Sequence, residues 1–149
     1  MTPLCRCRRL AAMAKLVLHP LPGSKRAGEL TRLLDELWRA GRRVVVWVQD
    51  EGRRQMLDDF LWTYSKLAFL PHALWTPSMG EVADPIVLVG ETANPNRAEV
   101  LVVGDELPPG AWAATFEEVH DLVPADEEGA PRQAAWQRWR EEFTQEVDA

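Results

Sequence analysis

Long apolar runs and cysteines are scarce in this chain of 149 residues. No run approaches the roughly 20 apolar residues that a membrane-spanning helix needs. Residues 1–14 are basic, but their apolar part is shorter than the roughly 7–15 residues of a signal-peptide core. The two cysteines, Cys5 and Cys7, are too few and too close in sequence to form a structural disulfide or a tetrahedral metal site by themselves. We therefore expect a cytoplasmic protein without a membrane segment, in which residues 1–14 are a disordered leader or a start-site over-extension.

An excess of positive charge is also lacking. The chain has 17 Lys and Arg against 23 Asp and Glu, which gives a formal net charge of −6. Proteins that bind a nucleic-acid backbone neutralise its phosphates with Lys and Arg. The acidic net charge therefore argues against direct binding of single-stranded DNA. Direct binding stays an alternative, because tryptophan rings can stack on the bases of single-stranded DNA. We expect contact with nucleic acid to be indirect and any anion site to be local.

Catalytic and nucleotide-binding motifs do not occur in the sequence. The segment from Gly23 to Gly28 has the glycine spacing of a phosphate loop, but Glu29 and Leu30 stand where that loop needs Lys and Ser or Thr. Neither the dinucleotide motif G-x-G-x-x-G nor the hydrolase motif G-x-S-x-G is present. The histidines, which lack metal-ligand spacing, are His19, His72 and His120. We predict no intrinsic enzymatic activity, no cofactor and no metal, with an enzyme acting on nucleotides as the alternative.

Hydrophobic periodicity, in contrast, is clear. Apolar residues make up 46% of the chain, which is enough for one buried core. From Leu30 to Trp38 the apolar residues recur at intervals of three and four, which indicates one face of a helix, and Gly41 stands where that helix should end. The uninterrupted apolar run at residues 44–48 is typical of a central strand covered on both faces.

Strand and helix patterns alternate along the chain. Short β-rich runs predict strands at residues 15–19, 44–48, 73–75, 86–90 and 100–104. Helices are predicted after Ser24, at residues 51–62, around residues 112–119 and from Pro131 onward. This alternation predicts a single α/β domain over residues 15–145, a Rossmann-like layered sheet with helices on both faces.

Tryptophan is unusually frequent, with seven residues in the chain. Trp38 lies on the leucine stripe and Trp47 in the central strand, so we expect both in the core. Trp62 and Phe69 flank the exit of the helix at residues 51–62. Because tryptophan is enriched both in cores and at binding hot spots, a core position and an exposed partner surface are equally open for this pair.

The last helix is a second candidate surface. At helical spacing, Trp136 and Trp139 lie on the same side as Arg132, Arg140 borders that side, and Arg138 lies opposite. Periodicity alone favours a helix that packs its tryptophans on the sheet. The alternative is an aromatic pocket flanked by guanidinium groups, which could accept an acidic peptide with a hydrophobic terminus.

Four ordered blocks of sequence carry a resemblance to a known family. They are Leu-Trp-Arg-Ala-Gly-Arg-Arg-Val at residues 37–44, Gln-Asp-Glu at 49–51, Leu-Asp-Asp-Phe-Leu-Trp at 57–62 and Phe-Leu-Pro-His at 69–72. With this spacing, the chain resembles the chi subunit family of DNA polymerase III from about residue 15 to residue 142. The resemblance implies a Rossmann-like domain without nucleotide chemistry, acting as a non-catalytic accessory subunit in DNA replication.

The family's partners imply two surfaces on this chain. One surface binds the psi subunit, which connects to the clamp loader, or in some bacteria a repair helicase. The residues implied for it are Trp62 and Phe69. The other surface binds the acidic C-terminal tail of single-stranded-DNA-binding protein. The residues implied for the tail are Val123, Arg132, Trp136, Arg138, Trp139 and Arg140.

The tail pattern departs from the family at one position. Residues 136–140 keep both aromatic residues and the final arginine, but Gln137 stands where the family has a lysine. Arg138 replaces that lysine only if the helix is rotated or the alignment shifts by one residue. We therefore expect Arg132 and Arg140 to meet the tail carboxylates, and an apolar pocket to take the ring of a terminal phenylalanine.

Overall fold

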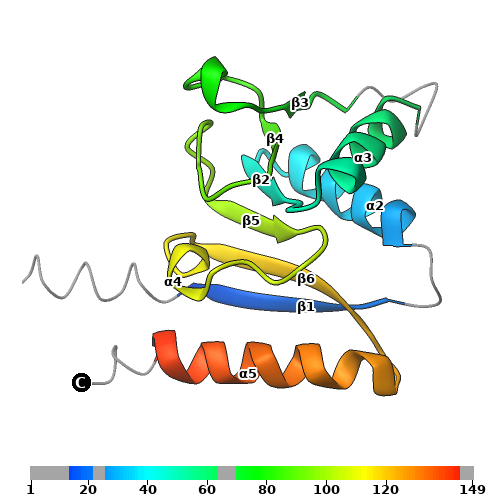
Figure 1. Ribbon diagram of the computed structural model, residues 1–149, viewed down its shortest axis with the longest axis vertical. Helices are drawn as coiled ribbons and strands as arrows, with labels where there is room; N and C mark the ends of the chain where they lie inside the picture. Colours follow the sequence, from blue (N-terminus) through cyan, green and yellow to red (C-terminus); the bar gives the residue numbers. More distant parts are fainter. Residues whose placement is uncertain (1–13, 22–25, 64–69, 145–149) are drawn as a thin grey trace, which may run out of the picture.

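A single parallel sheet organises the molecule, as Figure 1 shows. The computed structural model describes residues 14–21, 26–63 and 70–144. The strands are β1 (Lys15–Leu21), β2 (Val44–Trp47), β3 (Ala73–Leu74), β4 (Ile86–Val89), β5 (Val100–Val103) and β6 (Glu118–Pro124). They lie in the order β1-β6-β5-β2-β4-β3, and all neighbours are parallel. The predicted α/β class and layered sheet are confirmed.

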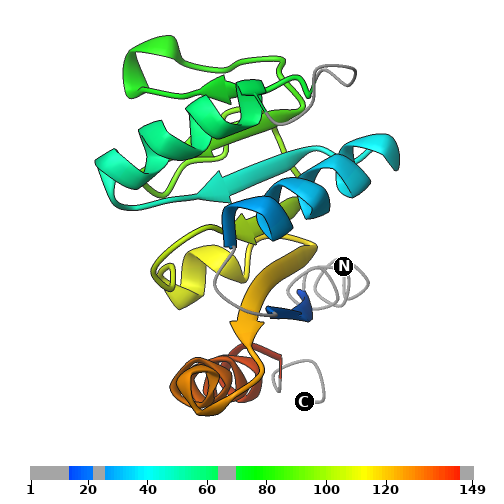
Figure 2. The ribbon, with the colours of Figure 1, turned by 90° about the vertical axis from the view of Figure 1, so that its right-hand side faces the viewer.

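Helices cover both faces of the sheet. They are α2 (Arg26–Arg39), α3 (Glu51–Thr63), α4 (Gly110–Ala113) and α5 (Ala130–Thr144), with short 3-10 turns η1 (Pro77–Met79) and η2 (Glu127–Gly129). In Figure 2, α2 and α3 lie in front of the sheet, where their leucines form one core cluster with β2, β4 and β5. Residues of α4 and α5 form a second cluster against the other face. Within the described ranges, every helix is too short or too polar to traverse a lipid bilayer.

The leucine stripe and the central strand explain how this core forms. In α2 the leucines of the predicted stripe are buried, and the helix is followed by Gly41, whose φ of 80° is the left-handed conformation that glycine adopts easily. All residues of β2 are buried, as expected for a strand covered on both faces. Trp47 is buried in the second cluster, on the face covered by α4 and α5, whereas Trp38 is half-buried and packs against the first cluster.

Strand β1 is longer than the sequence predicts. The prolines after residue 19 predict the end of the strand, but β1 continues through Pro20 to Leu21, in register with Val123 and Pro124 of β6. Among the described strands, β1 pairs only with β6 and so forms an edge of the sheet. Proline is tolerated there because an edge strand needs partners on one side only.

The region before α5 differs from the predicted helix at residues 112–119. A helix forms only over α4, and the chain then enters β6 at Glu118. Sequence reasoning missed this strand because the polar residues His120 and Asp121 interrupt its apolar pattern. Both are buried in the structure, where they have specific partners.

A chain of polar contacts joins β1 to β6 on the face covered by α2. His19 Nε2 lies 2.9 Å from His120 Nδ1, and their rings stack with centroids 5.1 Å apart. His120 Nε2 is 2.9 Å from Glu118 Oε1, and Arg42 Nη1 donates to Glu118 Oε2 at 3.2 Å. Burial lowers the pKa of His19 below 6.5, and His120 lowers it further. The hydrogen bond from His120, with that from Arg42, lowers the pKa of Glu118 below 4.5.

Folding stability should therefore fall in acid, beginning with His19. Below about pH 6.5 the unfolded chain binds a proton at His19 more readily than the folded chain does. The contribution of His19 to the free energy of unfolding is therefore complete above that pH and is lost as pH falls. We expect His19→Gln, which keeps a polar partner for His120, to reduce the loss of unfolding free energy between about pH 7.5 and pH 5 in urea titrations. Glu118 stays ionised in this window, so an unchanged slope in the variant would contradict the role of His19.

Candidate partner-binding surfaces at α5 and α3

A buried carboxylate fixes the position of α5. Asp121 on β6 is fully buried, and both of its oxygens accept hydrogen bonds from other elements. Arg26 Nη2 of α2 donates to Oδ1 at 3.0 Å, and Arg132 Nη2 of α5 donates to the same oxygen at 3.1 Å. Arg132 Nε and Trp136 Nε1 donate to Oδ2, the latter at 2.7 Å. One side chain thus links β6, α2 and α5, and we call this set the Asp121 network.

The two arginines of the network are also tied to the carboxyl ends of the strands. Arg26 donates to the Leu122 carbonyl at 2.8 Å and to the Gly104 carbonyl at 3.2 Å. Arg132 Nη2 donates to the Asp105 carbonyl at 2.6 Å. Burial lowers the pKa of Arg26, and the charge of Asp121 opposes that shift. Both guanidinium groups are therefore held at one edge of the sheet.

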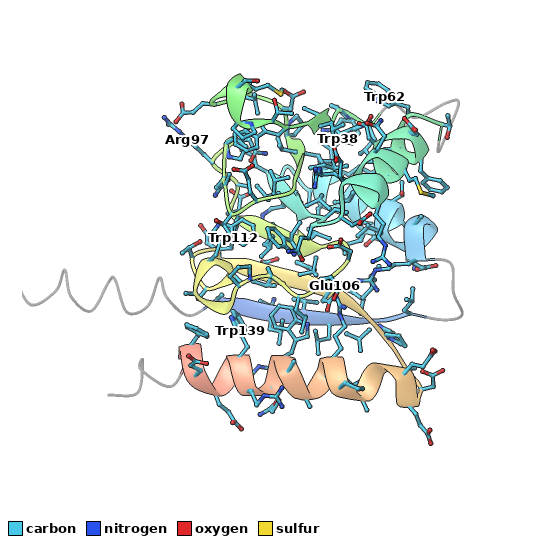
Figure 3. The ribbon with its side chains drawn as sticks, viewed as in Figure 1. Trp38, Trp62, Arg97, Glu106, Trp112 and Trp139 are labelled. Atoms are coloured by element: carbon cyan, nitrogen blue, oxygen red, sulfur yellow. The ribbon has the colours of Figure 1, made fainter. Side chains whose placement is uncertain are left out.

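A hollow lies between α5 and the segment leading into α4. It has a volume of about 230 Å³, and its wall includes Leu107, Pro108, Trp136, Arg138, Trp139 and Phe143. Trp139 Nε1 donates to the Gly110 carbonyl at 2.9 Å, and the rings of Trp136 and Trp139 meet edge to face with centroids 5.2 Å apart. Figure 3 shows Trp139 pointing from α5 toward α4. We call this the α4–α5 hollow.

The structure divides the residues predicted for the tail surface into separate groups. Trp136, Arg138 and Trp139 line the α4–α5 hollow. Arg132 lies farther along α5, bound into the Asp121 network, and Val123 is buried in β6. Arg140 is exposed on α5 outside the lining of the hollow.

Of the three arginines predicted on α5, Arg138 is therefore the one that lines the hollow with the tryptophans, although the helical wheel assigns it to the opposite side. The two tryptophans are 3% and 6% exposed, so they pack on the sheet as periodicity indicates. The small part of each ring that stays exposed lines the hollow, so the same two side chains pack on the sheet and form part of the pocket.

Trp62 lies at the far end of the molecule from α5, as Figure 3 shows. Its side chain is 52% exposed, and its ring lies over His72 with centroids 4.4 Å apart. His72 is buried, with Nδ1 2.7 Å from the Leu70 carbonyl and Nε2 3.2 Å from Asp58 Oδ1, the latter without hydrogen-bond geometry. Trp62 thus exposes a large aromatic surface, and the buried ring of His72 holds it in place. Phe69, its predicted neighbour, lies outside the described residues.

Sequence reasoning missed residues that fix the position of α5 and form the wall of the α4–α5 hollow. Asp121 and Arg26 belong to no motif, and the only signal was an acidic residue inside the apolar segment that became β6. No sequence pattern predicted that Leu107 and Pro108 form a wall of the hollow. Their place beside α5 depends on the path of the chain between β5 and α4.

Removing the charge of Asp121 should destabilise the protein strongly. Asp121→Asn leaves Arg26 and Arg132 without their shared counter-charge in a largely buried place, so we expect the free energy of unfolding to fall by about 3–5 kcal/mol in denaturant titrations. Glu106→Gln, which neutralises an exposed carboxylate nearby, should stay within about 0.5 kcal/mol of the parent. Equal stability of the two variants would show that the network contributes little.

Comparison with known proteins identifies the family. The family model described as DNA polymerase III chi subunit, HolC, matches residues 13–148. The DNA polymerase III subunit chi of Pseudomonas aeruginosa is 30% identical over 131 residues, which cover 86% of this chain and 88% of the relative. That of Escherichia coli is 28% identical over 105 residues, which cover 70% and 69%. These matches extend over most of the sequence and over the sheet and helices described above, and the chain therefore belongs to the DNA polymerase III chi subunit family.

Proposed function

We propose that this protein is a non-catalytic adaptor in DNA replication, with one surface for the acidic tail of single-stranded-DNA-binding protein and another for a second protein. The α4–α5 hollow carries the proposal for the tail. It combines two anchored tryptophans with the guanidinium group of Arg138 on a chain whose net charge is −6. A peptide that ends in carboxylates and a hydrophobic ring has matching chemistry.

The lining of the hollow suggests how such a tail would lie. The aromatic ring would enter between Trp139 and Leu107, where the wall is apolar. The carboxylates would lie toward Arg138 and away from Glu142, which also lines the hollow. A charge-assisted hydrogen bond to Arg138 would become stronger where the bound ring displaces water from it.

We assign different roles to the other arginines. Arg132 already donates to Asp121 and to the Asp105 carbonyl, so we propose that it holds α5 in place. Val123 is buried in β6 and lies beside Gly129, directly before α5, so we propose that it supports the start of that helix. Arg140 is exposed one residue after Trp139, where we propose that it attracts the acidic part of the tail.

The surface around Trp62 would bind the second partner, either the psi subunit of DNA polymerase III, which connects to the clamp loader, or a repair helicase. A half-exposed tryptophan supported by a buried histidine has the features of a binding hot spot. Because Trp62 and the α4–α5 hollow lie at opposite ends of the molecule, both partners could bind at once.

Arg138→Ala should weaken tail binding without unfolding the protein. One charge-assisted hydrogen bond contributes about 1.5–3 kcal/mol, so we expect the dissociation constant for a labelled tail peptide to rise about tenfold or more in fluorescence anisotropy. Arg138→Lys should retain part of the affinity because it keeps the charge. Arg39→Ala, which removes an arginine from α2, is the control and should bind normally. Unchanged affinity in Arg138→Ala would overturn the assignment of the hollow.

Trp62→Ala should separate the two partners. In a pull-down from extract of the source organism, we expect this variant to lose the second partner and to retain single-stranded-DNA-binding protein. Arg138→Ala should give the opposite pattern. Loss of both partners from the Trp62→Ala sample would contradict independent surfaces, and the circular dichroism spectrum of each variant would identify loss through unfolding.

A further inference from the structure

A second hollow lies between α2 and α3, at the carboxyl edge of the sheet. It has a volume of about 240 Å³, and neither Trp62 nor any residue of α5 lines it. Leu30, Val48 and Leu57, all nearly inaccessible, form its apolar floor. Met56 and Phe60 stand at its rim, 71% and 37% exposed. We call it the α2–α3 groove.

Two exposed apolar residues of α3, Met56 and Phe60, lie together at this groove. Met56 and Phe60 are four residues apart on the helix and so share one side, with Arg53 one turn before Met56. An exposed methionine beside a phenylalanine provides an adaptable apolar contact surface. Exposed groups of this kind, rimmed by polar residues, mark interaction sites in soluble proteins.

The charged residues that line the groove are both cationic. They are Arg26 and Arg53, and its described lining includes no Asp or Glu, although the chain as a whole has a net charge of −6. Arg26 is fixed by the Gly104 and Leu122 carbonyls and by Asp121, so its guanidinium group is preorganised. Arg53 is 63% exposed, and its Nη1 lies 3.9 Å from Glu106 Oε2, a loose pair that a ligand carboxylate could replace.

We propose that the α2–α3 groove binds an acidic peptide segment of a partner protein through a large apolar side chain flanked by carboxylates. The apolar side chain packs on Leu57 and Met56, and a carboxylate meets Arg53, while Arg26 stays bound to Asp121 at the inner wall of the groove. Charge complementarity selects this occupant, because the charged residues of the described lining are both arginines and the contact of Arg53 with Glu106 is loose enough for a ligand carboxylate to replace it. The site is distinct from the α4–α5 hollow and from the surface around Trp62, so it provides a third contact.

The methionines allow the groove to be observed directly. The chain has four methionines, of which Met56 lies at the rim and Met79 lies in η1, outside the lining of the groove. We would label the full-length protein with [13C-methyl]methionine, assign the Met56 signal with Met56→Leu, and titrate an acetylated and amidated hexapeptide, Asp-Asp-Leu-Phe-Asp-Asp. We expect the Met56 signal to shift with saturation and the Met79 signal to stay in place.

Two arginines with the same exposure supply a matched pair of variants. Arg53 and Arg39 are each 63% exposed, but only Arg53 lines the groove. Arg53→Glu should weaken the peptide about tenfold or more, whereas Arg39→Glu and Arg138→Ala should bind as the parent does.

Three results would overturn the proposal. The first is a Met56 signal that does not move at millimolar peptide. The second is equal binding of Lys-Lys-Leu-Phe-Lys-Lys, which would remove the charge argument. The third is a Met56 shift that follows protein concentration without peptide, which would assign the groove to a second copy of the chain. None of these results depends on whether the α4–α5 hollow binds its tail.

Discussion

The buried charge of Asp121 is the constraint on which the arrangement of layers depends. A carboxylate removed from water is strongly unfavourable unless charges and donors compensate it. Here the compensation comes from both sides of the sheet, from Arg26 of α2 and from Arg132 and Trp136 of α5. Helix α2 covers one face of the sheet and helix α5 covers the other. Moving either helix would break hydrogen bonds to the same carboxylate, so the two layers are coupled through β6.

This coupling occupies the place where open parallel sheets usually bind ligands, beyond the carboxyl ends of their strands. Arg26 and Arg132 reach the carbonyls of Gly104, Leu122 and Asp105 at that edge. The backbone amides of Gln49 and Asp50 are bound in turn by the Asp105 carboxylate at 2.9 Å. The segments that follow β2 and β5 are therefore engaged with the protein's own side chains, and the candidate contact surfaces lie on the helices around them.

Sequence pattern predicts those helices and strands in which apolar side chains recur at regular spacing or in an unbroken run. The leucines of α2 and the valines of β2 are examples, since each set is buried as its spacing indicates. Strand β6 could not be found in this way, because Asp121 is stabilised by residues 95 and 11 positions away in the chain. The same limit applies to Arg138. The helical wheel places it opposite the tryptophans, yet it lines the same hollow, which exists only because the segment before α4 packs there.

The proline in β1 has a consequence for the molecule's behaviour among other chains. An edge strand of seven residues offers a row of backbone groups with which a foreign strand could pair. Pro20 has no N–H, so it interrupts that row near its carboxyl end. Intermolecular extension of the sheet is disfavoured there, so Pro20 protects this edge from aggregation through backbone pairing.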